Sequence, residues 1–313
     1  MARARATIGD PDVPIKEKAI FKWSINHERA KHIHKGRVMI AGNAAHRHPP
    51  ANGLGTNKCI QDAFNLAWKL AMVLKGKAGD GLLDTYSAER LPVARQVVDR
   101  AMKSVADMMP ISNALGFEPG QNEAEGWANV DELFSDTDRG RERRKALRSA
   151  VDLQNYQFNC HGVEMGQTYA SSAGISDGTA QRAPTRDPEL YYEHSTFPGR
   201  TIPHAWLQRN QARVSTHDLV GKGRFTILTG VGGDAWRAAG KAVADKLGID
   251  IDVYSIGGPN CDAHDVYGTG AGVCEIEDGG CLLVRPDRHI AWRQKNAVAG
   301  SEGRLLEVMR TVL

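Results

Sequence analysis

The stretch GRVMIAGNAAHRHPPANGLGTN, residues 36–57, is the most informative part of the chain. Its composition predicts a strand over Arg37–Ala41, then a loop that contains two prolines, and then a helix that begins near Asn57. The N-terminus of a helix presents free N–H groups and about half a positive charge from its macrodipole. The stretch therefore suits an anion or a polar ring system held at the start of the helix.

The loop itself contains residues that favour a close approach by a flat ligand. Gly53 and Gly55 have no side chains, so the backbone can come near such a ligand. Pro49 and Pro50 stiffen the loop and donate no backbone N–H bonds. A tight turn from a strand to a helix, without any ligand, explains the same composition equally well. Composition alone leaves both interpretations open.

Two helices are predicted after the loop. In the first, apolar residues recur at spacings of three and four and share one face, whereas Asp62, Asn65 and Lys69 lie off that face. The apolar residues are Ile60, Ala63, Phe64, Ala67, Leu70, Ala71 and Leu74. The second helix, over Ser87–Met109, has a similar face with Leu91, Ala94, Val97, Val98 and Ala101.

The rest of the chain divides into a polar connection and an α/β unit. Residues 106–195 predict helices at Glu125–Leu133, Arg141–Leu153 and Asn155–Tyr169, and the basic run within 138–148 is read as a solvated helix face. Residues 196–313 predict a strand, a helix, a second strand, two further strands and a terminal helix, which is a thioredoxin-like order. The expected strands are 224–229, 249–256, 280–287 and 289–293, and the expected helices are 236–247 and 301–313.

Composition excludes several classes of protein. The 40 Lys and Arg residues against 37 Asp and Glu residues give a formal charge of +3, without the concentrated basic face of a nucleic-acid-binding protein. No apolar run approaches the ~20 residues of a membrane span. The N-terminus lacks a hydrophobic signal core, and the five cysteines form no CxxC pair. We therefore expect a cytoplasmic protein with reduced thiols, no nucleic-acid partner and no membrane partner.

Several common motifs are absent from the sequence. Residues 53–58 and 268–273 both fail a GxGxxG pattern at the sixth position, and neither a P-loop nor a GxSxG elbow occurs. His46 and His48 have no third ligand at a clear spacing, so hydrogen-bonded histidines are favoured over a metal site, and no metal is expected.

Several ordered motifs together resemble the class A FAD-dependent aromatic hydroxylases, in their phenol hydroxylase branch. That family's second flavin motif usually reads Gly-Asp-Ala-Ala-His, then Pro-Pro, then Gly-x-Gly-x-Asn, and residues 42–57 match it closely. Further segments with the same resemblance are Ile60–Ala71, Tyr86–Ala94, Leu153–Asn159 and Leu283–Arg293. The fold class implied is α/β (α+β mixed). Residues 1–195 would form part of a FAD-binding domain, and residues 196–313 a thioredoxin-like domain.

The resemblance assigns roles to individual residues. Asn43, which follows Gly42, stands where the family has an aspartate that holds the ribityl hydroxyls of the flavin; it is uncharged but still accepts a hydrogen bond. Pro50 matches the proline beside the reacting centre and is the candidate catalytic residue. The backbone amides of Gly53, Leu54, Gly55, Thr56 and Asn57 match those that meet the flavin N1–C2=O edge. Asp62, Asn65 and Trp68 are assigned packing or supporting roles.

The resemblance also implies a reaction and its partners. NADPH reduces FAD, the reduced flavin and dioxygen form a C4a-hydroperoxide, and a phenolate takes up the distal oxygen to give an ortho-hydroxylated product. Water must be excluded from this site. The thioredoxin-like region has no CxxC pair, so a packing or dimerisation role is expected for it.

The family's N-terminal GxGxxG segment and its Asp-Gly motif are not found in this sequence. The chain is therefore expected to be the C-terminal portion of a monooxygenase, joined by a missing N-terminal half or by a second copy of itself. Three hypotheses remain at this point: a truncated or naturally short hydroxylase; a non-catalytic remnant or one half of a split enzyme; and a stand-alone thioredoxin-like binding module. The third leaves the flavin loop unexplained. Because the dinucleotide fingerprint is absent and Asn43 replaces the aspartate, we expect the chain alone not to hold FAD tightly.

Overall fold

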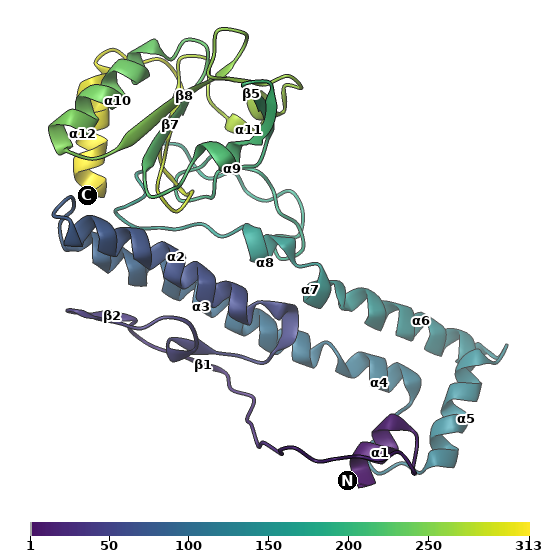
Figure 1. The fold of residues 1–313 in the computed structure, drawn as a ribbon. Helices are drawn as coiled ribbons and strands as arrows, with labels where there is room; N and C mark the ends of the chain where they lie inside the picture. Colours follow the sequence, from purple (N-terminus) through teal and green to yellow (C-terminus); the bar gives the residue numbers. More distant parts are fainter. Residues whose placement is uncertain (1) are drawn as a thin grey trace.

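The computed structural model describes residues 2–313, which form two long helices, a helical arm and a sheet-containing unit (Figure 1). An N-terminal helix with no buried residue, α1, precedes an extended segment and short strands beneath the long helices. These first elements are α1 (Ala2–Ile8), β1 (Glu28–Arg29), β2 (His34–Lys35), β3 (Val38–Met39), η1 (Gly42–Ala44), β4 (His46–Arg47) and η2 (Ala51–Gly53).

The strand predicted over Arg37–Ala41 is shorter than expected. Only Val38–Met39 forms a strand, and it pairs with β2 as a two-residue antiparallel hairpin. A second two-residue pair joins β1 to β4. Within residues 2–313 no larger sheet extends either pair, so the backbone ladder stops after two residues.

The two long helices, α2 (Gly55–Leu74) and α3 (Gly81–Ala106), lie side by side as an antiparallel pair (Figure 1). On α3 the predicted apolar face is buried, with Val97 2% and Val98 0% exposed. On α2 the predicted apolar face is uncovered, because Ile60 is 61% and Phe64 50% exposed. The polar face of α2 is the buried one, and its buried residues are Lys58, Asp62, Asn65, Trp68 and Lys69.

Three helices beyond α3 form an arm that projects away from the sheet (Figure 1). They are α4 (Met109–Leu115), α5 (Glu123–Phe134) and α6 (Asp138–Leu153), and the last two confirm the helices predicted in this region. Asn122 closes a capping box with Glu125 at the start of α5, and Thr137 caps α6. Arg139, Arg141, Lys145 and Arg148 are exposed, whereas Arg143 and Arg144 donate to backbone carbonyls of the arm, so the basic run is mostly a solvated face.

The single helix predicted over Asn155–Tyr169 is wrong. The chain forms two short helices, α7 (Asn155–Phe158) and α8 (His161–Met165), and then an extended segment in which Thr168 bridges Arg200. A Cβ on Gly162 would lie 2.0 Å from the carbonyl oxygen of Pro188. This glycine therefore permits close packing of α8 against the loop that contains Pro188.

The C-terminal part is a seven-stranded mixed sheet with the strand order β11-β10-β7-β8-β9-β5-β6. The β7–β8 and β8–β9 pairs are parallel and the others antiparallel. The predicted order of strands and helices is confirmed, and β5, β6, β9 and two short helices add to it. The elements are β5 (Trp206–Arg209), β6 (Ala212–Ser215), α9 (Thr216–Leu219), β7 (Phe225–Thr229), α10 (Asp234–Leu247), β8 (Ile251–Gly257), β9 (Ala263–His264), α11 (Thr269–Cys274), β10 (Cys281–Val284), β11 (Ile290–Gln294) and α12 (Ser301–Val312).

The sheet and the long helices share one core. Helices α10 and α12 cover one face of the sheet (Figure 1), and Trp236 of α10 packs edge to face on Trp292 of β11. Trp68 of α2 joins the same cluster and meets Phe225 of β7 with ring centroids 5.8 Å apart. The predicted supporting role of Trp68 is thus a contact between the long helices and the sheet.

Candidate functional site

The loop between β3 and α2 is built from two single-turn helices and a strand. Gly42 begins η1 with φ +59°, and Asn52 within η2 has φ +65°. A Cβ on Gly42 would lie 3.0 Å from the sulfur of Cys59, and a side chain at this φ is strained. Glycine at position 42 thus allows the chain to turn tightly over the first turn of α2.

Asp62 of α2 organises the inner side of this loop. Its Oδ2 accepts hydrogen bonds from the backbone N–H of Gly42 at 3.1 Å and from His46 Nε2 at 2.8 Å, and its Oδ1 accepts from Arg90 Nε at 2.7 Å. Burial opposes ionisation of this carboxyl, but the His46 hydrogen bond and the Arg90 charge outweigh burial and lower the Asp62 pKa to about 2. Asp62 is therefore ionised at neutral pH and fixes the end of the strand on α2. His46 is a buried hydrogen-bonded histidine, and no group of three or more metal-binding side chains occurs in the described chain.

Arg90 extends these contacts toward the C-terminal sheet. It donates from Nη1 to the hydroxyl of Tyr169 at 2.9 Å. The ring of Tyr169 stacks on His289, with ring centroids 4.1 Å apart. A continuous set of contacts thus runs from Gly42 through Asp62 and Arg90 to the residues after β10.

Asn52 ties the outer side of the loop to α7. Its Nδ2 donates to the carbonyl oxygen of Tyr156 at 2.7 Å, and Cys160 Sγ lies 3.3 Å from the same nitrogen. The segment Leu153–Asn159 resembled the family without an assigned role, and the structure gives it one. It holds the proline-containing loop at Asn52, whose backbone is left-handed. Asparagine adopts this conformation more readily than most other residues.

A groove of about 710 Å³ opens on one side of the loop. Five of the residues predicted to bind a cofactor line it: Asn43, Pro50, Gly53, Gly55 and Thr56. A Cβ on Gly53 would meet nothing within 4 Å, so the cradle is open at this position. The α2 N-terminus at the groove has neither a capping side chain nor an acidic residue in its first turn, so its free N–H groups are available to an acceptor on a ligand.

The other predicted residues lie away from this groove. Gly42 is buried and does not line the groove, and its N–H donates to Asp62. Leu54 and Asn57 line a different cavity on the far side of the loop, and Asn57 Nδ2 donates to the carbonyl oxygen of Gly53 at 3.2 Å. Asn43, which does line the groove, is exposed, and its Oδ1 lies 3.8 Å from the thiol of Cys59.

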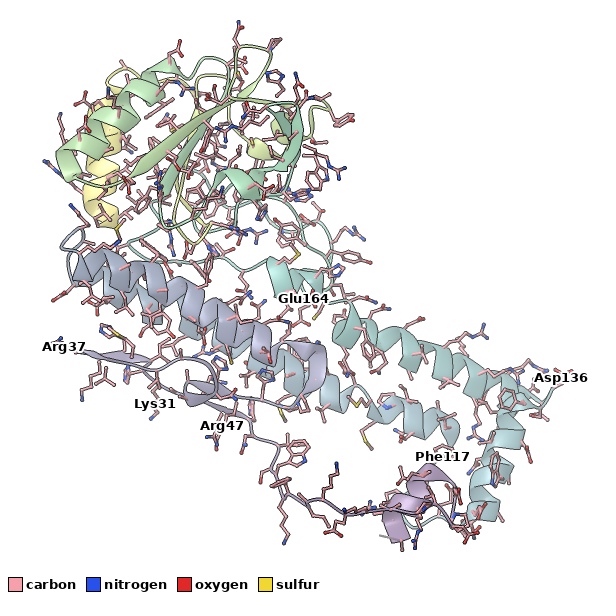
Figure 2. The ribbon with its side chains drawn as sticks, viewed as in Figure 1. Lys31, Arg37, Arg47, Phe117, Asp136 and Glu164 are labelled. Carbon is pink, nitrogen blue, oxygen red and sulfur yellow. The ribbon has the colours of Figure 1, made fainter. Side chains whose placement is uncertain are left out.

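Some residues of the groove were not foreseen. Trp23, Ser24 and Asn26 reach it from the extended segment before β1, and the ring of Trp23 is 71% exposed. No local sequence pattern marks these residues, because an extended segment outside helices and strands has no periodic spacing of apolar residues. Arg47 also lines the groove, and Figure 2 shows it on the exposed side of the short strands beneath α2 and α3.

A buried cluster of charges joins α2 and α3 to the C-terminal sheet. Glu89 of α3 accepts from Lys69 Nζ at 2.7 Å and from Arg285 Nη1 at 2.6 Å. Arg285 also donates from Nη2 to Asp287 Oδ2 at 2.6 Å, and Asn65 Nδ2 donates to Glu89 Oε2 at 2.7 Å. Burial and the two neighbouring carboxylates act in opposite directions on Arg285, and the net effect raises its pKa. Burial lowers the pKa of Lys69 to about 8, so the cluster is ionised at neutral pH, and its contacts join the long helices to the sheet.

Lys58, in the first turn of α2, is a buried cation without such partners. Its side chain is 2% exposed, and nothing among residues 2–313 accepts a hydrogen bond from its Nζ. Burial, assisted by the charge of Arg90, lowers the Lys58 pKa from 10.5 to about 7.

This depressed pKa predicts a pH dependence of stability. Between about pH 7 and 10.5 the unfolded chain binds a proton at Lys58 that the folded chain does not bind. The free energy of unfolding should therefore rise with pH by up to about 1.4 kcal/mol per unit in this window. The Lys58→Met variant should lose that contribution, whereas Lys75→Met, at an exposed lysine after the same helix, should keep it. Urea unfolding of the three proteins at pH 7, 8 and 9 measures the difference, and equal slopes for all three would contradict the assignment.

Comparisons with known proteins match both parts of the chain. The family described as FAD binding domain matches residues 1–101, and the family described as aromatic-ring hydroxylase, C-terminal, matches residues 195–313. The 2,4-dichlorophenol 6-monooxygenase of Delftia acidovorans is 47% identical over 98% of this chain and 52% of its own length. The phenol 2-monooxygenase of a Pseudomonas species is 44% identical over 97% of this chain and 50% of its own length.

A solved structure agrees with these relatives. The flavin-dependent monooxygenase PieE, in complex with FAD and substrate, superposes with a TM-score of 0.91 at 45% identity, over 99% of this chain and 53% of that protein. The chain thus spans about half the length of the proteins it matches. Across the described residues, no helix is long and apolar enough to cross a membrane.

Proposed function

Because the chain belongs to the FAD-dependent aromatic-ring hydroxylases, of which it spans about half the length, we propose that it is part of an enzyme that hydroxylates a phenolic ring. The observation that carries this proposal is the groove in which Asn43, Pro50, Gly53, Gly55 and Thr56 meet at the open N-terminus of α2. Residues more than ten positions apart converge there, which a turn without a ligand does not require.

The groove fits the flavin half of FAD. Gly53 and Gly55 leave the backbone open to a flat ring, and the uncapped N–H groups of α2 meet a partly negative edge of that ring. We assign Asn43 to the ribityl hydroxyls, Pro50 to the reacting face, and the backbone of residues 53–57 to the N1–C2=O edge. Gly42 acts indirectly, because it places Asn43 while Asp62 holds its N–H. Leu54 and Asn57 contribute their backbone only, since both line the opposite cavity.

When bound, FAD supplies the hydroxylating chemistry, with NADPH as reductant and dioxygen as the source of oxygen. The residues of this chain orient the ring and stabilise negative charge at its pyrimidine edge through the α2 N-terminus. Pro50, whose ring carries no N–H, presents a rigid wall beside the reacting centre. Asp62, ionised and bonded to His46 and Arg90, keeps that wall in place.

The uncovered face of α2 supports a further partner for this chain. Ile60, Phe64 and Leu74 are 61%, 50% and 79% exposed, and Phe21 and Trp23 of the extended segment are 83% and 71% exposed. Apolar surface of this extent marks an interaction site. We propose that it receives the N-terminal half that the relatives possess, whether in the same polypeptide or as a separate chain. A non-catalytic remnant would have no reason to keep both this face and the groove.

We place the boundary between the FAD-binding part and the thioredoxin-like part near residue 195, where the match to the C-terminal family begins. All five cysteines are free and no pair forms a CxxC motif. The thioredoxin-like part therefore has a packing role toward α2 and α3, in keeping with the Trp68–Phe225 contact.

A chimera tests the proposed function. The N-terminal half of the Delftia 2,4-dichlorophenol 6-monooxygenase, joined to this chain, should oxidise NADPH and incorporate one oxygen atom from labelled dioxygen into a phenol. Mass spectrometry of the product from phenol and from 2,4-dichlorophenol measures the activity and the preference. Gly55→Val places a side chain at the groove and should lower the rate at least about 100-fold, the scale of a misplaced reacting group.

The matched control is Gly303→Val, since a side chain at this glycine of α12 would meet nothing within 4 Å. It should retain the activity of the parent chimera. A folded, FAD-loaded chimera that oxidises no phenol would refute the proposed function.

A further inference from the structure

A second cavity, of about 440 Å³, lies on the opposite side of the flavin loop from the groove. It is open to solvent and is lined by the first turns of α2, by Val97 of α3, and by Glu164 of α8, which Figure 2 shows on the helix that faces the long pair. The two hollows share no lining residue. The cavity is therefore distinct from the groove in the residues that line it.

Two polar groups that the fold leaves unsatisfied line this cavity. Lys58 Nζ and Asn52 Oδ1 are both buried, and neither has a hydrogen-bond partner within residues 2–313. The orientation of the Asn52 amide is fixed, because its nitrogen already donates to the carbonyl oxygens of Tyr156 and Gln157. A buried polar group without a partner is unfavourable, and such groups in native proteins require an explanation.

The contrast with Lys69 shows that the fold can satisfy a buried lysine on this helix. Lys69 is 0% exposed and its Nζ lies 2.7 Å from Glu89 Oε2. The acidic residue nearest to Lys58 in sequence, Asp62, already accepts from Gly42, His46 and Arg90. Asp62 is therefore occupied, and no group among residues 2–313 accepts a hydrogen bond from Lys58 Nζ.

The surroundings of Lys58 define the chemistry of that acceptor. The α2 N-terminus brings partial positive charge and has no acid in its first turn. Leu54 and Val97 supply apolar walls, and Gln61 and Gln167 supply side-chain amides. The volume greatly exceeds the roughly 30 Å³ that one water molecule occupies.

We propose that this cavity binds a small organic anion, with its carboxylate or phenolate oxygen on Lys58 and its apolar body against Leu54 and Val97. Glu164 at the cavity wall selects against ligands with more than one negative charge, because a second charge would face a carboxylate. An oxyanion on a buried ammonium forms a charge-assisted hydrogen bond, which is stronger than a neutral one.

Calorimetric titration of the chain with benzoate, and with its neutral counterpart benzamide, tests the proposal. Benzoate should bind with one-to-one stoichiometry and benzamide about 10–100-fold more weakly, the loss expected for one charge-assisted hydrogen bond. Lys58→Met should weaken benzoate by a similar factor and remove the difference between the two ligands. Lys75→Met should change neither affinity.

Titrations of the unsubstituted chain at two pH values give a test that needs no variant. The charged groups around Lys58 are Arg90, Asp62, Cys59 and Glu164. With the Lys58 pKa at about 7, protonated lysine is about 30-fold scarcer at pH 8.5 than at pH 6, so benzoate should bind about 30-fold more weakly at the higher pH. The absence of saturable binding at pH 6 would overturn the proposal and leave water as the partner of Lys58. Equal affinities for benzoate and benzamide, or no change in Lys58→Met, would also overturn it.

Discussion

Purified alone, the 313-residue chain is expected to remain colourless after incubation with FAD and gel filtration. The groove offers contacts to the ring and ribityl parts of the flavin, but the sequence has no glycine fingerprint for the pyrophosphate. One wall of the groove is formed by Trp23 and Ser24 of an extended segment that no strand of the described chain covers. Adding the N-terminal half of a relative should raise the retained flavin at least about 100-fold, since affinity grows tenfold for every 1.4 kcal/mol of new interaction.

Ultraviolet–visible absorbance spectra, together with flavin fluorescence, measure the amount of FAD that the protein retains. Double substitution of the uncovered face, Ile60→Glu with Phe64→Glu, should abolish the gain without lowering the melting temperature of the chain, because both side chains are at least half exposed. Val151→Glu, at a 53% exposed position on α6, is the matched control and should leave the gain intact. A yellow protein with stoichiometric FAD, obtained from this chain alone, would show that the groove suffices.

The second large effect is expected at Arg285. Arg285→Met removes the arginine that pairs with the buried carboxylates of Glu89 and Asp287. Glu89 keeps its ion pair with Lys69. Breaking a buried ion pair from one side typically lowers stability by about 3–5 kcal/mol, because the remaining charge stays in a dry environment. The exposed Arg141→Met, which removes surface pairs with Asp136 and Asp138, should change stability by less than about 1 kcal/mol.

Urea unfolding followed by circular dichroism distinguishes these values. The lost stability of Arg285→Met should be accompanied by weaker protection of the β3–α2 loop in hydrogen exchange, since Asp287 and His289 connect the cluster to Tyr169 and Arg90. A loss for Arg285→Met no larger than that for Arg141→Met would mean that the cluster does not hold the helices on the sheet.

The sequence predicted the local structure better than it predicted the surroundings of each element. The strand–loop–helix order around residues 36–57 and the α10–β8–β10–β11–α12 order follow from periodicity and turn residues. The shortening of β3 and the break at Asn159 do not, because both depend on which neighbours are available for pairing. Gly162 is an example, since its packing partner, Pro188, lies in a loop without any pattern.

The candidate site could be predicted only in part, because the sequence shows local patterns but not the neighbours of each residue. Glycines, prolines and a helix N-terminus mark the groove in the sequence, and five predicted residues line it. The side on which Leu54 and Asn57 lie depends on the twist of the loop, and Asn52 fixes that twist through a contact with α7. Much of the polar face of α2 is buried because Glu89 pairs with Asn65 and Lys69 and Arg90 pairs with Asp62, and no single helix reveals such partners.

The pairing of Glu89 with Arg285 also sets the order of events during synthesis. The two residues are 196 positions apart, whereas Lys69, the other cation on Glu89, has already been made when Glu89 emerges. Ribosomes add about 5–20 residues per second, so Glu89 waits about 10–40 s for its second partner. During that interval Glu89 is paired with Lys69 but not yet with Arg285. The contact that ties α3 to the residues after β10 can therefore form only after translation has passed residue 285.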